Sequence, residues 1–266
     1  MTNIHPTAIV DPGATLGEGV KIGPYCVIGD KVQLGDRTCL KSHVALEGTT
    51  TLGPDCTVFP FASIGSRPQD LKYRGEESRL VIGAKVVIRE HATLNPGTEG
   101  GGLVTEVGDS CLIMVGAHIA HDCKVGNNVI FANNATLAGH VEVGEYAVLG
   151  GLSAVHQFVR IGRHAMVGGM SGVENDVIPY GSVTGNRAHM SGLNIVGIKR
   201  RGFERQAIHD LRHAYRVLFA PEGTLQERIA EVAKDFASNP VVMEIVDFIR
   251  SESSRSICQP EAERAG

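Results

Sequence analysis

A six-residue period runs through about the first two thirds of the chain. In residues 4–64 every sixth residue is Ile, Leu or Val, and the same spacing of apolar residues returns in residues 82–94 and 107–173. The residue four places after each of these anchors is Ala, Ser, Thr, Val or Cys, except for Pro68. No α-helix has this period, because helical faces repeat every 3.6 residues. The pattern therefore predicts short strands joined by tight turns.

Three such hexads close one triangular coil of eighteen residues, with the anchor and the small residue pointing inward. Stacked coils then form parallel sheets with strands about 4.8 Å apart. Small interior residues beside the anchors suit a narrow prism. This explains why only 5% of the residues are aromatic and none is Trp. The expected fold class is mainly β, a parallel β-helix shaped as a triangular prism.

The cysteines follow the same pattern. Four of the six, Cys26, Cys56, Cys111 and Cys123, occupy the small inward position, and there is no CxxC pair. Buried filler is therefore the favoured interpretation, rather than redox or metal chemistry. The absence of a disulfide framework suggests a reducing compartment.

Two phase breaks predict loops outside the prism, because a solenoid tolerates insertions on its surface. The first loop covers residues 65–80 and is highly polar, and the second covers residues 98–106 and is rich in glycine. The second does not have the Lys and Ser or Thr of a phosphate-binding loop, so a flexible external loop is expected. The β-helix is predicted to span residues 1–186.

Residues 187–266 are predicted to form a C-terminal helical domain. Residues 201–219 have apolar side chains at helical spacing, and residues 224–237 and 240–250 suggest two more helices. Thr224 and Glu227 are placed to form a capping box at the start of the middle helix. Residues 187–220 are basic, whereas the rest of the tail is acidic.

Bulk properties exclude several classes of protein. The net charge of −4 and the pI near 6.3 argue against a general nucleic-acid binder. The start, MTNIHPTAIV, does not resemble a signal peptide, and no apolar stretch is long enough to span a membrane. A cytoplasmic location is expected.

The stretch AHIAHDC, residues 117–123, is the main candidate for chemistry. In eighteen-residue coils His121, Gly139 and Gln157 form one column, with Asp122 and His140 in the next. His118, His121 and His140 occupy neither inward position, so their side chains are expected to point outward and to be accessible. Surface decoration, a zinc site and a general base are the alternatives, since imidazole serves all three. The carboxylate beside His121 and the glycine N–H of the next coil favour the general base.

The hexads resemble the hexapeptide-repeat acyltransferases, which implies a left-handed β-helix and a homotrimer with active sites between neighbouring prisms. Longer motifs resemble the LpxA family of UDP-N-acetylglucosamine O-acyltransferases, which begin the biosynthesis of lipid A, the anchor of lipopolysaccharide. These motifs span almost the whole chain: QDLKYRGE, AHIAHDC, FANNATLAGHV, GGLSAVHQF, MVGGMSGV and GIKRRGFER.

The resemblance implies roles for individual residues. His121 is expected to be the general base, Asp122 to orient it, and the Gly139 N–H to face the developing oxyanion. Attack on the acyl thioester is expected to be direct, with no covalent acyl-enzyme. The implied contacts to UDP-N-acetylglucosamine are Gln69, Asp70, Lys72, His118, His140, His156, Gln157, Asn194, Arg200 and Arg201.

The implied acyl donor is acyl carrier protein, which carries a 3-hydroxyacyl chain on phosphopantetheine. The protein is therefore expected to need no cofactor and no metal of its own. Acyl carrier protein is acidic, so the basic residues Arg205, Arg212 and Arg216 are docking candidates. Gly169 is implied to set the length of the acyl chain, and a glycine there leaves room for roughly the fourteen-carbon class.

Alternatives remain open at this stage. An N-acyltransferase acting on a 3-amino analogue of the same sugar nucleotide would use much the same residues. A zinc hydratase on the same fold would use histidines as ligands. A purely structural solenoid would not depend on His121.

Overall fold

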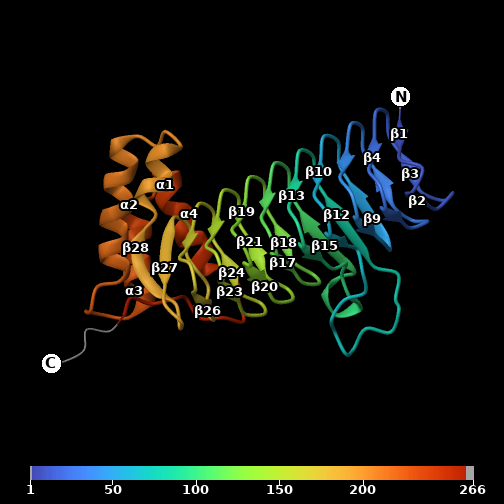
Figure 1. Cartoon of the computed structure of the whole chain (residues 1–266). Helices are drawn as coiled ribbons and strands as arrows, with labels where there is room; N and C mark the ends of the chain where they lie inside the picture. The colour runs from blue at the N-terminus through green and yellow to red at the C-terminus, as the bar shows by residue number, and fades with distance from the viewer. Residues whose placement is uncertain (1, 262–266) are drawn as a thin grey trace.

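The computed structural model describes residues 2–261 and shows a triangular prism of stacked coils with helices at its C-terminal end (Figure 1). Most strands are two residues long, and in nearly all coils the anchor is buried while its neighbour faces outward. Successive coils pair in parallel with an eighteen-residue register, as in Asn3↔Lys21 and His118↔Thr136. The fold class expected from the sequence, a left-handed parallel β-helix followed by helices, is confirmed.

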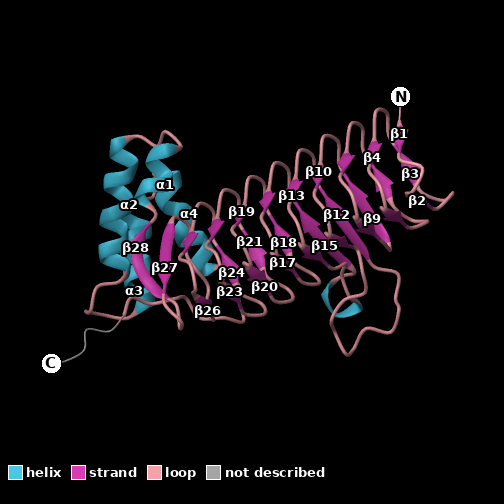
Figure 2. Ribbon diagram, in the orientation of Figure 1, coloured by secondary structure: helices cyan, strands magenta, loops and turns pink. Residues whose placement is uncertain are grey.

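Three sheets form the faces of the prism across residues 2–261 (Figure 2). We call them sheets A, B and C. Sheet A contains β1 (Asn3–Ile4), β4 (Lys21–Ile22), β7 (Cys39–Leu40), β10 (Thr57–Val58), β13 (Val87–Ile88), β16 (Leu112–Ile113), β19 (Ile130–Phe131), β22 (Val148–Leu149), β25 (Met166–Val167), β27 (Gly181–Thr184) and β28 (His189–Leu193). Sheet B contains β2 (Ile9–Val10), β5 (Val27–Ile28), β8 (Ala45–Leu46), β11 (Ser63–Ile64), β14 (Thr93–Leu94), β17 (His118–Ile119), β20 (Thr136–Leu137), β23 (Ala154–Val155) and β26 (Gly172–Val173). Sheet C contains β3 (Thr15–Leu16), β6 (Gln33–Leu34), β9 (Thr49–Leu52), β12 (Arg79–Ile82), β15 (Val104–Val107), β18 (Lys124–Val125), β21 (Glu142–Val143) and β24 (Arg160–Ile161).

The core is the narrow interior of the prism. It consists of the anchors and their small partners, and Phe131 is one of its largest side chains. The four cysteines at inward positions are buried, as expected, and burial raises the pKa of the Cys123 thiol to about 12. A thiol with such a raised pKa is a poor nucleophile, which agrees with its interpretation as filler.

The C-terminal end begins with a hairpin that the six-residue pattern does not predict. β27 and β28 form an antiparallel hairpin that ends sheet A, and the predicted domain boundary at residue 187 lies in its turn. A short helix, α1 (Ile195–Arg200), was also missed. The domain boundaries themselves remain a prediction.

Three further helices follow close to their predicted positions. They are α2 (Arg205–Leu218), α3 (Leu225–Asp235) and α4 (Pro240–Arg250). The predicted capping box is confirmed, since the Glu227 N–H donates to the Thr224 hydroxyl and the Thr224 N–H donates to the Glu227 carboxylate. Within the described residues, no helix combines the length and the apolar character needed to cross a bilayer.

Candidate active site

The AHIAHDC stretch places His121 and Asp122 in the turn between β17 and β18, at the corner where sheets B and C meet. Asp122, His140 and Phe158 occupy the same turn position in consecutive coils, with φ of 60°, 62° and 66°. Asp and His are among the residues that tolerate this left-handed conformation best. The predicted columns are confirmed, because the His140 N–H donates to the His121 carbonyl at 3.0 Å.

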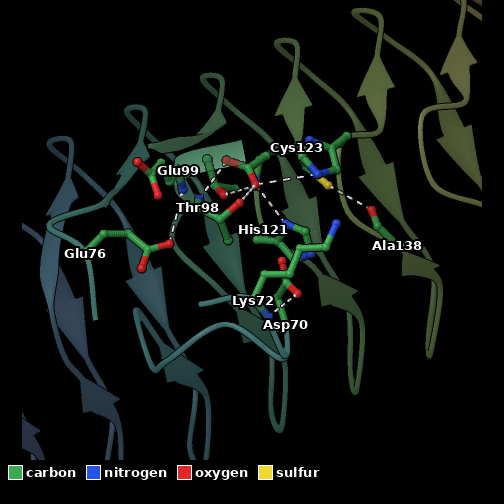
Figure 3. A network of polar contacts seen from close by, with 11 residues as sticks. Asp70, Lys72, Glu76, Thr98, Glu99, His121, Cys123 and Ala138 are labelled. Carbon is green, nitrogen blue, oxygen red and sulfur yellow. Dashed lines mark hydrogen bonds and ion pairs between the residues drawn. The ribbon is translucent and has the colours of Figure 1, made fainter. Parts of the chain in front are cut away.

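Thr98 and His121 belong to a buried hydrogen-bond network (Figure 3), and Asp122 is its centre. Its Oδ2 lies 2.7 Å from Nδ1 of His121 and accepts a hydrogen bond from the Thr98 hydroxyl at 2.6 Å. Its Oδ1 accepts from the Thr98 N–H at 2.8 Å, and the Asp122 N–H donates to the Thr105 hydroxyl at 2.8 Å. Both oxygens of the carboxylate are thus fixed, and the imidazole is fixed with them.

The charge of Asp122 determines which nitrogen of His121 is free. Burial alone raises the pKa of Asp122, but the hydrogen bonds from His121 and Thr98 outweigh burial, so the pKa lies below its ordinary value. An ionised carboxylate only accepts hydrogen bonds, so Nδ1 of His121 carries the proton in this pair. The neutral imidazole then presents a free lone pair on Nε2, which is what a general base needs.

Replacing Thr98 by valine should test this network. We expect the free energy of unfolding at neutral pH to fall by about 1.5–3 kcal/mol, the usual contribution of a hydrogen bond to a charged group. The lowered pKa of Asp122 gives stability that is present above the ordinary carboxyl pKa of 3.8 and is lost as the pH falls through the lowered value. The variant raises that pKa, so the difference between variant and wild type should shrink below about pH 4.

Chemical denaturation between pH 3 and 7 would measure this difference. Thr57→Val is the matched control, because Thr57 lies on sheet A with its side chain half-buried. A difference for Thr98→Val that stays the same at every pH would contradict the assigned role of its hydroxyl.

The second loop lies against the site. Thr98 and the short 3₁₀ helix η1 (Glu99–Gly101) lie close to Asp122. A Cβ atom added to Gly101 would lie only 2.0 Å from the Cγ atom of Asp122. The expectation of a free external loop therefore misses its contact with the site. β15 pairs with β18, so this loop ends directly beside the turn of Asp122. The register could have revealed this contact, and with it the roles of Thr98 and Thr105.

The predicted accessibility of the histidines was wrong for His121, which is only 6% exposed. His118 and His140 are half-buried. The close approach of neighbouring elements, including the second loop over Asp122, encloses the imidazole more than an isolated coil would. A buried base is screened from water, which strengthens its interactions with a bound substrate.

Gly139 lies directly against the imidazole. A Cβ atom at this position would be 2.4 Å from Cε1 and 2.6 Å from Nε2 of His121. Within residues 2–261 the Gly139 N–H donates to no protein acceptor. The glycine thus leaves space for the ring and for a substrate atom, with a free N–H close by.

Two further histidines flank the base. Nδ1 of His118 lies 2.7 Å from the Thr93 hydroxyl, a partner that the sequence did not suggest. Burial lowers the pKa of His118, and the neighbouring His121 lowers it further. Burial also lowers the pKa of His140, although the Asp122 carboxylate opposes this. Both rings are therefore neutral near pH 7 and can donate or accept hydrogen bonds.

His121, Asp122 and His140 also form a group that could bind a metal ion, since one ligand atom of each lies within 4.8 Å of the others. Both Asp122 oxygens accept hydrogen bonds from Thr98, and one also faces His121. These are the hydrogen bonds that a general base held by a carboxylate requires.

The first loop brings its predicted residues to the same place. Asp70 and Lys72 lie near His140, since the charges of both act on the pKa of its imidazole, and the Lys72 N–H donates to Asp70 Oδ1 at 2.9 Å. Gln69 is exposed in the same loop. His156 and Gln157, in the next coil of the strip, are exposed as well. These side chains are available to a ligand.

Asn194, Arg200 and Arg201 lie elsewhere. They line a cavity of about 690 Å³ between α1 and the outer face of sheet A, over β19, β22, β25 and β27. Arg200 is exposed, and Arg201 donates to the Tyr146 carbonyl at 3.0 Å. The Asn194 amide already caps α1 through the Gly197 N–H and donates to the His164 carbonyl. One chain therefore does not bring this group together with the histidine strip.

The remaining predicted residues lie on the C-terminal half. Arg205, Arg212 and Arg216 are exposed on α2, and Arg212 and Arg216 border a cavity of about 480 Å³ with Leu193 and Tyr215. Gly169 is exposed, and a Cβ atom there would meet only the Gly151 backbone, at 3.3 Å. The surface beside Gly169 is thus open.

The stacked hexapeptide coils and the histidine–carboxylate pair at the prism corner agree with the class of hexapeptide-repeat transferases. The family model of bacterial transferase hexapeptides matches residues 13–48 and 105–139. Domain 2 of UDP-N-acetylglucosamine O-acyltransferase matches residues 176–258.

Individual relatives narrow the class to one family. An acyl-[acyl-carrier-protein]–UDP-N-acetylglucosamine O-acyltransferase of Caulobacter vibrioides is 58% identical over 98% of this chain and 99% of its own. The corresponding enzyme of Rickettsia canadensis is 50% identical over 98% of each chain.

A crystal structure of a UDP-N-acetylglucosamine acyltransferase is 45% identical, with a TM-score of 0.94 over 98% of this chain and all of its own. LpxA from Acinetobacter baumannii is 43% identical, with a TM-score of 0.93 over 96% of this chain and 99% of its own. The chain belongs to the UDP-N-acetylglucosamine O-acyltransferase family, which confirms the resemblance and the prediction of an acyltransferase.

Proposed function

We propose that this protein transfers a 3-hydroxyacyl chain from acyl carrier protein to the glucosamine 3-hydroxyl of UDP-N-acetylglucosamine, the first step of lipid A biosynthesis. The observation that carries the proposal is the geometry of His121, with Nδ1 held by Asp122 and Nε2 left beside the Gly139 backbone. Relatives that match over 98% of this chain are named acyl-[acyl-carrier-protein]–UDP-N-acetylglucosamine O-acyltransferases, which supports the proposed donor and acceptor.

In the proposed reaction, Nε2 of His121 takes the proton of the sugar hydroxyl as its oxygen attacks the thioester carbon. A C–O bond forms, and the carbonyl oxygen takes on negative charge that the Gly139 N–H stabilises. The C–S bond then breaks, and the thiolate of phosphopantetheine leaves with the proton that His121 returns. Asp122 stabilises the transient imidazolium. The chain itself needs no metal or cofactor in this scheme.

We also propose that the protein works as a homotrimer in the cytoplasm. In a triangular prism the corner between sheets B and C is opposite sheet A, so the histidine strip and the Arg200–Arg201 cavity face different directions. Two neighbouring prisms would bring one of each together. The arginines suit a diphosphate, because a guanidinium can donate to two oxygens.

The donor site is proposed to lie beside α2. Arg205, Arg212 and Arg216 are exposed on this basic helix, as docking of an acidic carrier protein requires. The acyl chain would extend past the open surface at Gly169.

Replacing Gly169 by methionine should therefore shorten the preferred acyl chain. A large side chain there would block the path of a long acyl chain along this surface, whereas its backbone surroundings leave room for the substitution itself. We expect transfer of roughly fourteen-carbon chains to fall by at least about tenfold relative to shorter chains. Competition between labelled donors of different lengths would measure the preference. An unchanged preference would mean that the acyl chain does not pass Gly169.

The acceptor atom is the part of the proposal most in need of an experiment. Wild-type protein, 3-hydroxyacyl carrier protein and an equimolar mixture of UDP-N-acetylglucosamine and its 3-amino analogue would be incubated together, and the products separated by mass spectrometry. The proposal predicts mainly the ester. Predominant amide would identify an N-acyltransferase instead.

A further inference from the structure

The C-terminal segment, residues 251–260, folds back from the end of α4 onto the last coil of the prism. The segment is held in place by Asp176, a residue of the last coil that is fully buried. Asp176 Oδ2 accepts hydrogen bonds from Ser253 at 2.7 Å and from Nε of Arg160 at 2.8 Å. The Asp176 N–H donates to the Ser256 carbonyl, and the Cys258 N–H donates to the Asp176 carbonyl. The segment is thus fixed on both sides of Arg255.

Arg255 reaches from this segment to the histidine strip. Its Nη2 lies 2.6 Å from Nδ1 of His156, and its Nε donates to the Gln157 carbonyl at 3.0 Å. Its own N–H donates to Ser253, which fixes the residue further. Residues about a hundred positions apart in the sequence therefore meet at one end of the strip.

The contact determines the tautomer of His156. A guanidinium has only donors, so Nδ1 of His156 must be the acceptor, and the proton of the neutral ring lies on Nε2. An alternative contact, from Nδ1 to the Gln157 carbonyl at 3.3 Å, would need a proton on Nδ1. That carbonyl already accepts from Arg255, and the 2.6 Å contact is the shorter of the two. His156 therefore presents an N–H donor on its other side.

We propose that Arg255 is a positioning residue for the acceptor substrate: it holds His156 as an Nε2–H donor for an oxygen of the sugar nucleotide. This inference rests on the proposed function, because it takes His156 as a substrate contact. UDP-N-acetylglucosamine is rich in carbonyl, hydroxyl and phosphate oxygens, all of which accept. Nothing in the acyl donor is needed for this contact, so the role concerns binding of the acceptor.

Arg255→Ala frees the imidazole to rotate and to change tautomer. We expect the KM for UDP-N-acetylglucosamine to rise by about tenfold, the effect of weakening one charge-assisted hydrogen bond. The kcat and the KM for the acyl donor should change by less than about twofold, because the interaction is the same in the ground and transition states. Arg255→Lys keeps the charge and one donor but loses the second N–H group that the guanidinium offers. It should therefore restore part of the affinity for UDP-N-acetylglucosamine.

Arg250→Ala is the matched control, since Arg250 is an exposed arginine at the end of α4. A double-mutant cycle with His156→Ala separates a role through His156 from a general effect of charge. In the His156→Ala background the substitution of Arg255 should cause little further loss. Equal losses in both backgrounds would overturn the proposal, as would an unchanged KM or a loss confined to kcat and melting temperature.

Binding of UDP-N-acetylglucosamine measured by calorimetry, without any acyl donor, keeps this test separate from the test of the reaction. Wild type that binds the sugar nucleotide about tenfold more tightly than Arg255→Ala supports the inference, even if a different acyl donor is used. Wild type that neither binds nor acylates it would overturn both proposals. Wild type that acylates it while Arg255→Ala binds equally well would overturn the inference alone.

Discussion

Replacing His121 by alanine is expected to lower kcat for acyl transfer by about 10²- to 10⁴-fold, the usual contribution of a general base. The substitution removes Nε2, the group beside Gly139 that would accept the sugar proton. The KM for UDP-N-acetylglucosamine should change much less, because the flanking side chains remain. Steady-state kinetics with both substrates varied would measure the effect.

Two controls separate this loss from a general disturbance. His43→Ala removes an exposed histidine from an early coil and should leave kcat unchanged. His121→Gln keeps a donor that can reach Asp122, so it should preserve the fold while remaining inactive. Retention of more than about a tenth of the activity by His121→Ala would mean that another group takes the proton.

Gly139→Ala should be nearly as damaging, although it adds only a methyl group. The new Cβ would lie 2.4 Å from Cε1 of His121, so the imidazole would have to move away from its place beside Asp122. A displacement of about 1 Å in a catalytic group can cost about 10²-fold in rate. We expect such a fall in kcat, measured in the same assay.

Gly29→Ala is the control for the loss of a glycine. A Cβ atom there would make ordinary contacts, the nearest at 3.4 Å from the Leu46 carbonyl oxygen. This variant should keep full activity. If Gly139→Ala also kept it, the ring of His121 would not need the position that the structure gives it.

The prism could be predicted from the sequence because its period is local and repeated. Each hexad carries its own anchor and small partner, so register, sheet number and the columns through His121 follow from counting residues. The same counting placed Asp122 beside His140. Counting could have placed the loop that carries Thr98 beside the turn of Asp122, because β15 pairs with β18. It could not show how far the neighbouring elements bury His121, because loops have no period.

The C-terminal part was less predictable for a related reason. The apolar spacing of α2, α3 and α4 and the capping box at Thr224 are local signals, and they were recognised. The hairpin of β27 and β28, the short helix α1 and the contact from Arg255 to His156 depend on the chain returning to the last coil. Such long-range contacts leave no periodic trace in the sequence.

The most direct test of the central claim is transfer of a labelled 3-hydroxyacyl chain from carrier protein to UDP-N-acetylglucosamine by wild-type protein treated with a strong chelator. The account assigns the proton transfer to the imidazole of His121, held by Asp122, so it predicts full activity in protein from which metal has been removed. Loss of activity with the chelator and its return with zinc would contradict this account and would make His121, Asp122 and His140 a metal site.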